Sequence, residues 1–172
     1  NTVAENSAAA VVGNITVTDP NAGDSHVLTV SDTRFEIVGG QLKLKAGQSL
    51  NYEGGAVINL DLTATDNGNP QKSLTTPFVI LVTDQDEAPT NISLSATTVA
   101  ESLPGAVVGV LQFTDPDPRD VHQFSVNDNR FEVIGTVLKL KPTVSLDFET
   151  LTSINVTVTA TDADNSQLST NK

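Results

Sequence analysis

Acidic side chains gather at one point near the middle of the chain. The segment LVTDQDEAPTNISL, residues 81–94, places Asp84, Asp86 and Glu87 directly before an Ala-Pro pair, in a chain of 172 residues whose formal net charge is −12. Carboxylates this close repel one another by a few kcal/mol at intermediate dielectric. Ca²⁺ removes that repulsion, because it is a hard cation that takes roughly six to eight oxygen ligands. The segment therefore predicts a divalent-cation site.

Other site chemistries find little support in the residue types. Cysteine is absent, so disulfides and thiolate metal sites are excluded. Zn²⁺ would need His or Cys, and the two histidines, His26 and His122, stand at equivalent places where strands are expected to start, which suits a scaffold role. No G-x-S-x-G motif occurs. The acids gather at a junction and do not face each other across a cleft as a glycosidase pair would, so we expect no enzyme.

The overall charge limits the partners. A pI of about 4.2 argues against binding nucleic acid or anionic membranes, both of which need basic surface. No apolar run approaches the roughly 18 residues of a membrane span, so membrane insertion is not expected. The sequence shows no signal peptide and does not begin with Met, which favours a segment cut from a longer chain.

The segments that must position the acids occur twice in the sequence. TVAENSAAAVVGNITVTDP, from residue 2, returns as TVAESLPGAVVGVLQFTDP from residue 98, and RFEIVGGQLKLK, from 34, returns as RFEVIGTVLKLK from 130. The offset is 96 throughout, and 35 of the 73 aligned positions are identical. Such an internal repeat predicts two copies of one structural unit.

Each copy has the pattern of half-buried strands. Residues 58–64 alternate apolar and polar side chains, and so do residues 42–45. Turn signals divide each copy into about seven short strands, and no stretch has a helical period. These features predict an all-β fold of two tandem seven-stranded, immunoglobulin-like Greek-key sandwiches. The core of the first copy is expected to contain Val12, Ile15, Leu28, Phe35, Leu42, Leu44, Ile58, Leu60 and Leu62.

The repeat also shows that each copy lacks one terminal strand. Residues 91–97, NISLSAT, have no counterpart in the first copy, and residues 76–82, TPFVILV, have none in the second. An edge without its neighbour exposes unpaired backbone groups and part of the apolar face. Two explanations remain open. The chain is an excerpt of a longer array, or a like chain supplies the missing strand by strand exchange.

Five motifs in order resemble a cadherin repeat, twice over and across essentially the whole chain. They are AEN (4–6), TDP with the following Asn or Asp (18–21 and 114–117), LNYE and LDFE (50–53 and 146–149), ATDNG (64–68) and TDQDEAPT (83–90). The linker resembles that of bacterial cadherin-like modules. The resemblance implies cadherin-like sandwiches over 1–84 and 91–172, joined by a calcium-binding linker over 85–90, with up to three Ca²⁺ ions at each junction.

The resemblance also implies a set of metal ligands. Two come from the first copy, three from the residues around the linker and three from the second copy. Asn51 stands where the family usually has Asp, and Asp86 stands where Asn is usual, so the number of ions stays open. Asp120 lies in a loop that is not matched well enough to be included. The expected ligands are Glu5, Glu53, Asp84, Asp86, Glu87, Asp115, Asp117 and Asp162.

The remaining acids fit the same scheme as half-sites. Asp19, Asn21 and Asp66 would face a preceding repeat, and Glu101, Asp147 and Glu149 a following one. We therefore expect a calcium-stiffened segment of a long extracellular adhesin or surface stalk, bacterial in origin, whose partners are neighbouring repeats of the same protein. The alternatives are a filament or matrix subunit that assembles through donated β-strands, and a carbohydrate or homophilic binding module.

Overall fold

The computed structural model describes residues 1–21, 23–163 and 168–172, and every helix or strand assigned in these ranges is a β-strand. The chain divides into two compact units, Asn1–Gln85 (unit 1) and Asp86–Lys172 (unit 2). The predicted all-β fold with two tandem sandwiches is confirmed. Most of the expected linker, from residue 86 onward, belongs to unit 2.

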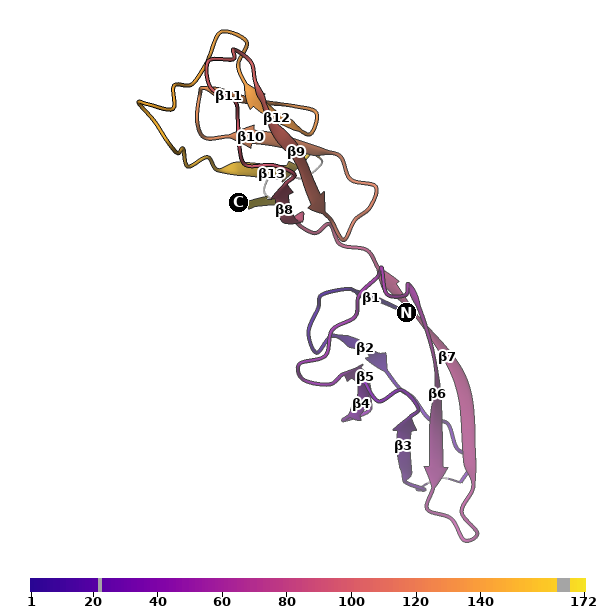
Figure 1. The fold of residues 1–172 in the computed structure, drawn as a ribbon. Coiled ribbons are helices and arrows are strands. Elements are labelled where there is room, and N and C mark those ends of the chain that lie inside the picture. Colours follow the sequence, from indigo (N-terminus) through magenta and orange to yellow (C-terminus); the bar gives the residue numbers. More distant parts are fainter. Residues whose placement is uncertain (22, 164–167) are drawn as a thin grey trace. The chain divides into compact units, whose positions relative to one another are not determined.

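Unit 1 contains two sheets, with the strand orders β1-β7-β6-β3 and β2-β5-β4 (Figure 1). β1 runs parallel to β7, and the other neighbouring pairs of this unit are antiparallel. β6 and β7 form a long hairpin. The strands are β1 (Thr2–Ala4), β2 (Val11–Asn14), β3 (His26–Val30), β4 (Phe35–Val38), β5 (Gln41–Leu44), β6 (Val57–Asp66) and β7 (Ser73–Thr83).

The alternation along β7 explains how unit 1 closes its core. Ile80 and Val82 are 0% and 4% exposed, whereas Val79 and Leu81 between them are each 47% exposed. Successive side chains of a strand point to opposite faces, so the first pair fills the space between the sheets. Their buried neighbours are Val3, Phe35, Leu42, Leu44, Leu50, Ile58 and Leu60.

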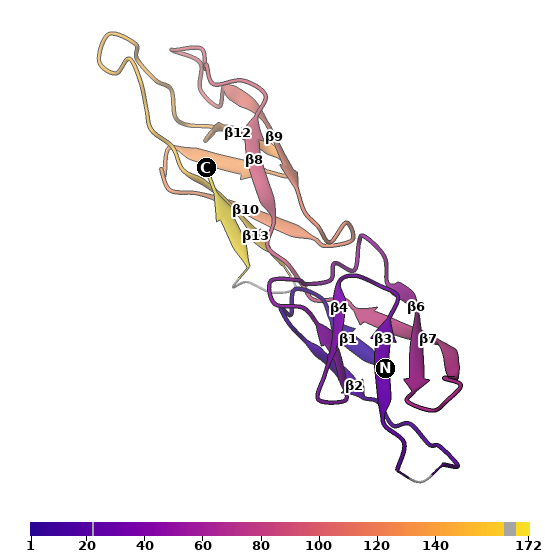
Figure 2. The same ribbon diagram turned by 90° about the horizontal axis from the view of Figure 1, so that it is seen from below.

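Unit 2 repeats this plan with the strand orders β11-β12-β9-β8 and β10-β13-β14 (Figure 2). All of its neighbouring strands are antiparallel. The strands are β8 (Thr90–Leu94), β9 (Val107–Thr114), β10 (His122–Val126), β11 (Phe131–Ile134), β12 (Val137–Leu140), β13 (Val158–Asp162) and β14 (Ser169–Asn171).

The lengths of several strands depend on whether a neighbouring strand is present and not on the local sequence. TVA forms strand β1 at residues 2–4 beside β7, but the same three residues at 98–100 form none. β6 has ten residues where β7 accompanies it, whereas its counterpart β13 has five. β9 has eight residues beside β8, whereas its counterpart β2 has four. Backbone groups form a ladder only where a partner strand supplies the complementary groups.

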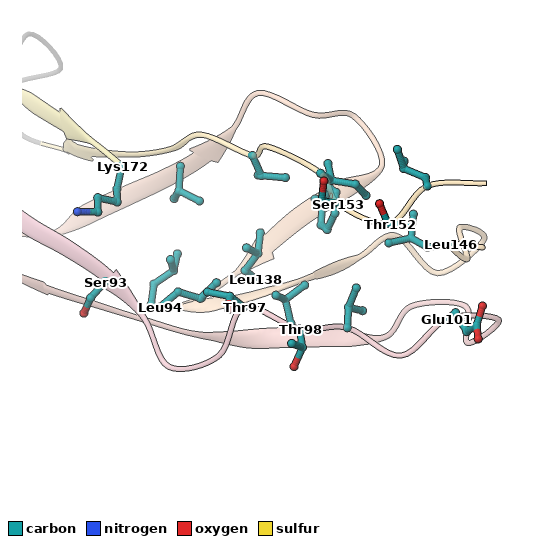
Figure 3. A pocket seen from close by; sticks show the side chains of 18 of the residues that line it. Ser93, Leu94, Thr97, Thr98, Glu101, Leu138, Leu146, Thr152, Ser153 and Lys172 are labelled. Carbon is teal, nitrogen blue, oxygen red and sulfur yellow. The ribbon is translucent and has the colours of Figure 1, made fainter. Parts of the chain in front are cut away.

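Each unit has an open groove where the other unit has a strand. In unit 1 a groove of about 340 Å³ is lined by Ile15, Thr16 and Thr18, whose counterparts in unit 2 pair with β8. Leu28 lines this groove and is only half buried, so the expectation of a core position was wrong for this residue. In unit 2 a larger groove lies where unit 1 has most of β7 (Figure 3).

Candidate metal-binding clusters

One end of unit 2 collects acidic side chains from four strand termini. β10 and β13 are antiparallel with His122 opposite Asp162, and β8 and β9 are antiparallel with Thr90 opposite Thr114. The end of β9 therefore lies beside the start of β8, and the end of β13 lies beside the start of β10. The bond between His122 and Asp115 brings the two pairs together at one end of the unit. The hydroxyls of Thr90 and Thr114 hold the second pair together, 2.9 Å apart and each bonded to the other residue's carbonyl.

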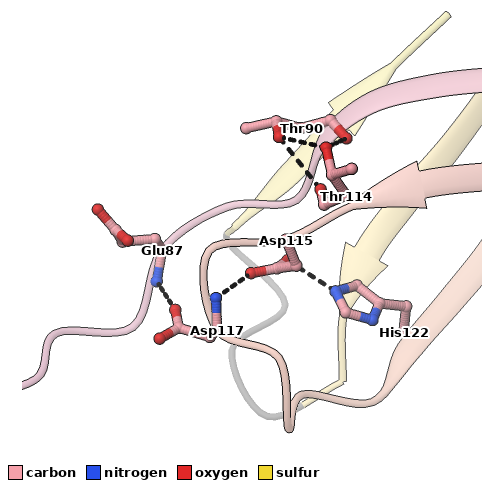
Figure 4. A network of polar contacts seen from close by, with 6 residues as sticks. All are labelled: Glu87, Thr90, Thr114, Asp115, Asp117 and His122. Carbon is pink, nitrogen blue, oxygen red and sulfur yellow. Dashed lines mark hydrogen bonds and ion pairs between the residues drawn. The ribbon is translucent and has the colours of Figure 1, made fainter. Parts of the chain in front are cut away.

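Hydrogen bonds fix the loop after β9 and the segment before β8 (Figure 4). Asp115 Oδ1 accepts the Asp117 N–H at 2.8 Å, and His122 Nε2 donates to Asp115 Oδ2 at 2.7 Å. Asp117, only 8% exposed, accepts the Glu87 N–H at 2.7 Å through Oδ2. Three of the expected ligands are thus brought together within unit 2. The histidine positions a carboxylate, in keeping with the scaffold role expected for it.

Three carboxylates crowd together at the same end. Ligand oxygens of Asp86, Asp120 and Asp162 all lie within 4.8 Å of one another, and Asp162 is fully buried. Burial, followed by repulsion from Asp162 and contact with Asp86, raises the pKa of Asp120 to about 6. Asp120 Oδ2 is buried and has no hydrogen-bond partner. These all-oxygen donors fit a hard cation such as Ca²⁺.

Asp120 is the residue that sequence reasoning left out, and the repeat carried a signal for it. Its equivalent in unit 1 is Asp24, one of the identical positions of the repeat. In unit 1 Asp24 lies in a group with Asp66, the equivalent of Asp162, and with Asp19, the equivalent of Asp115, again with oxygens within 4.8 Å of one another. A pair of matching acids in otherwise divergent loops indicates a shared role.

The unit 1 cluster is built like that of unit 2. Asp19 accepts the Asn21 N–H at 2.7 Å, and His26 Nε2 donates to it at 2.9 Å. The backbone hydrogen bond from Asn21, and then the bond from His26, lower the pKa of Asp19. Asp66 Oδ1 accepts the N–H groups of Gly68 and Lys72 at 3.0 and 2.9 Å, which fixes the turn after β6.

A second kind of cluster surrounds the glutamate of the AEN or AES motif. Glu5 is 1% exposed and accepts the N–H groups of Tyr52 at 2.8 Å and Gln85 at 2.9 Å. It thereby holds the turn that contains Glu53, the other ligand expected from the first copy, and the chain segment after Asp84, a ligand expected from the residues around the linker. Both are exposed.

Unit 2 repeats part of this arrangement. Glu101 accepts the Phe148 N–H at 3.0 Å, and its carboxylate lies with Asp147 and Glu149 in an exposed group whose ligand oxygens are within 4.8 Å. Asn51 replaces Asp147 in unit 1, where its side-chain oxygen accepts the Gly54 N–H. The half-sites expected from the sequence therefore exist as acidic groups within the units.

The expected ligands divide between the units. Glu5, Glu53 and Asp84 belong to unit 1, and Asp86, Glu87, Asp115, Asp117 and Asp162 belong to unit 2. Hydrogen bonds connect Glu87 and Asp115 to Asp117, while Asp86 and Asp162 lie with Asp120. Each unit is thus a β-sandwich with acidic groups at its strand ends.

Comparisons with known proteins identify the fold. No protein-family model matches the chain. Among solved structures, the extracellular cadherin domains 3–6 of protocadherin gamma B2 match all of the chain with a TM-score of 0.70 and 22% identity. Drosophila N-cadherin domains 1–4 match 96% of it with a TM-score of 0.69 and 19% identity, and mouse cadherin-23 domains 22–24 match 99% with 0.64 and 19%.

These likenesses establish the fold, and the chain consists of two tandem cadherin-like repeats, as the sequence motifs predicted. The match spans 43%, 44% and 59% of the three solved chains, respectively, so it covers about half of their length. In the described part of the chain, no helix is long and apolar enough to cross a membrane.

Proposed function

We propose that the chain is a calcium-stiffened, non-catalytic segment of a long extracellular adhesin or surface stalk. The main support is the group of Asp86, Asp120 and Asp162, three carboxylates held together within unit 2 with the pKa of Asp120 raised to about 6. A cation would relieve this repulsion. The acids would be Ca²⁺ ligands together with the linker residues, and the neighbouring repeats would be the partners.

The proposed ligand set combines both units. It extends the eight residues expected from the sequence by Asp120. When bound, Ca²⁺ supplies positive charge that converts repulsion among the carboxylates into attraction. Modules of this type in extracellular proteins bind at about 10⁻⁴ to 10⁻³ M, a range that suits extracellular fluid and not the cytosol. The proposed ligands are Glu5, Glu53, Asp84, Asp86, Glu87, Asp115, Asp117, Asp120 and Asp162.

A direct carbohydrate-binding role has less support. Sugar sites commonly present aromatic faces, and among the described residues Phe148 is the one aromatic side chain with high exposure, at 58%. Tyr52 is partly buried against the core of unit 1. A bacterial source remains part of the proposal because the linker resembles that of bacterial cadherin-like modules.

The test combines calcium titration with small-angle X-ray scattering. We expect calorimetry to detect binding of Ca²⁺ at millimolar concentration. We expect the distribution of interatomic distances from scattering to be longer and narrower in Ca²⁺ than in EDTA. Asp120→Asn should weaken this binding about tenfold or more and reduce the change in scattering. It removes one carboxylate from the group of Asp86, Asp120 and Asp162, to which the linker contributes Asp86.

Asp24→Asn is the matched control. It removes the equivalent carboxylate from unit 1, in a cluster to which no linker residue contributes. We expect it to leave the calcium-dependent change in scattering intact. Identical scattering of the unaltered protein in EDTA and in Ca²⁺, or equal effects of the two substitutions, would contradict the proposal.

A further inference from the structure

Four residues of unit 2 are linked by consecutive hydrogen bonds, from the start of β10 to the segment before β8 (Figure 4). His122 Nε2 bonds Asp115 Oδ2 at 2.7 Å. Asp115 Oδ1 accepts the Asp117 N–H, and Asp117 Oδ2 accepts the Glu87 N–H. An ionised carboxylate can only accept hydrogen bonds, so His122 must carry its proton at Nε2. His122 is the one member of the four that has no side-chain oxygen to offer a hard cation.

Aromatic packing holds the His122 ring in place. Its side chain is only 5% exposed, and its ring centroid lies 4.5 Å from that of Phe113. Phe113 in turn makes an edge contact with Phe124, with centroids 5.3 Å apart. The two phenylalanines belong to β9 and β10, so residues of two strands contribute to this packing. A fixed Nε2 donor determines the direction in which the Asp115 carboxylate can point.

Unit 1 has the same hydrogen bond without the aromatic rings. His26 Nε2 bonds Asp19 at 2.9 Å. The residues 96 positions before the two phenylalanines are Val17 and Leu28. The histidine–aspartate pair is therefore a feature of the repeat, whereas the aromatic packing around it is specific to unit 2.

We propose that His122 is a positioning residue for cation binding at this end of unit 2. The inference rests on the proposed calcium function, in which Asp115, Asp117 and Glu87 are ligands. A carboxylate that a donor already holds loses less rotational freedom when a cation binds. His122 thereby raises the affinity for the cation through Asp115. Loss of an outer-shell partner of this kind typically reduces metal affinity about 10- to 100-fold.

Two substitutions separate the donor from the ring. His122→Phe keeps a ring of similar size against Phe113 and removes the N–H, whereas His122→Gln restores an N–H donor without a ring. The measurement is a Ca²⁺ titration of the whole chain, followed by NMR at the Glu87 amide. We expect about tenfold weaker binding for His122→Phe, and recovery of most of the lost affinity in His122→Gln.

His26→Phe is the matched control. It removes the equivalent donor from unit 1, where the histidine bonds Asp19. The Glu87 amide reports on unit 2, because it donates to Asp117. We therefore expect the calcium midpoint at Glu87 to be unchanged in His26→Phe.

Hydrogen exchange in EDTA gives a reading that does not depend on calcium. The Asp117 N–H donates to Asp115, so its exchange should be about tenfold faster in His122→Phe, because a carboxylate that rotates freely accepts this bond less often. Exchange in His122→Gln should stay close to that of the unaltered chain. Unchanged exchange at the amides of β12 would verify that the substituted sandwich is folded.

Three results would overturn the proposal: an unchanged calcium midpoint in His122→Phe, equal losses in His122→Phe and His122→Gln, or unchanged exchange of the Asp117 N–H in EDTA. The failures of the two proposals can be told apart. Absence of calcium binding by the unaltered chain would refute both of them. Calcium binding that does not respond to His122→Phe would refute the positioning role alone.

Discussion

At the scale of residues, the buried acids combine two tasks. Glu5 and Asp117 accept backbone N–H groups and so hold loops in place. The buried Oδ2 of Asp120 accepts no comparable hydrogen bond. The pKa of Asp120 is raised to about 6 by burial and by repulsion from Asp162. Motif spacing was enough to point to the first two residues. For Asp120 the sequence carried only the match with Asp24, and the fold showed its surroundings, because the loop between β9 and β10 brings it next to Asp162 from a distant strand.

The pKa of Asp120 gives a prediction with a definite sign. An acid with a folded pKa of about 6 and an unfolded value of about 3.9 binds more protons in the folded state between these values. Its contribution to stability is therefore present at low pH and is lost as the pH rises through about 6. In EDTA, carbon-13 NMR of the carboxyl group should show titration near pH 6.

Two changes should lower that value. Asp162→Asn removes the charge that repels the ionised form, and bound Ca²⁺ stabilises it, so either should move the pKa of Asp120 towards its usual range. Hydrogen-exchange patterns of β10 and β12 would verify that the substituted chain is folded. An ordinary pKa for Asp120 in EDTA would mean that the three carboxylates do not crowd together in solution.

At the scale of elements, the alternating pattern predicted the class of structure and most of the first core. It was less informative about strand ends. The identical residues at 2–4 and 98–100 differ in structure because β7 lies beside only the first set. Local sequence carries no signal for a neighbour that comes from elsewhere in the chain. Val3 and Leu50 were likewise missed as core residues, because they lie outside the clearly alternating segments.

The close approach of β8 to β9 predicts unequal effects of one substitution in the two units. A Cβ atom on Gly109 would lie 2.9 Å from the backbone nitrogen and oxygen of Ala96. Gly109→Ala should therefore destabilise unit 2 by about 1 to 3 kcal/mol, since the backbone after β8 must move. At the equivalent Gly13 the nearest atom is 3.9 Å away, so Gly13→Ala should change stability by no more than about 0.5 kcal/mol.

Native-state hydrogen exchange can measure these effects separately for each unit, using the amides of β12 and β5. Equal losses from the two substitutions would show that the chain after β8 does not lie against β9 in solution. The comparison is matched because the two glycines occupy the same repeat position, and the surrounding Val-Val-Gly residues are identical.

At the scale of the whole molecule, each unit has acidic groups at both ends of its long strands. In unit 1, Asp66 ends β6, whereas Glu53 precedes its start and Asp84 follows β7. Ten residues of strand span about 33 Å, so the two acidic groups are well separated. The sequence predicted this distribution through the repeat, and the fold supplied the distances within each unit.

The parallel pairing of β1 with β7 has a mechanical consequence. Thr2, Val3 and Ala4 lie opposite Leu81, Val82 and Thr83, and the two strands run in the same direction. Tension on the chain would pull β1 back towards residue 1 and β7 forward towards residue 85. The strands would then be loaded in shear, so their hydrogen bonds would have to rupture together and not one after another.

Unit 2 has no such pairing among its described residues, since 98–100 form no strand. We expect single-molecule pulling to unfold unit 2 at a lower force than unit 1, and we expect Val3→Pro to reduce this difference, because it removes a backbone donor from the pairing of β1 with β7. Unfolding of both units at one force would contradict this. In a repeat with this parallel pairing, the three residues of β1 would therefore largely determine the force at which the repeat unfolds.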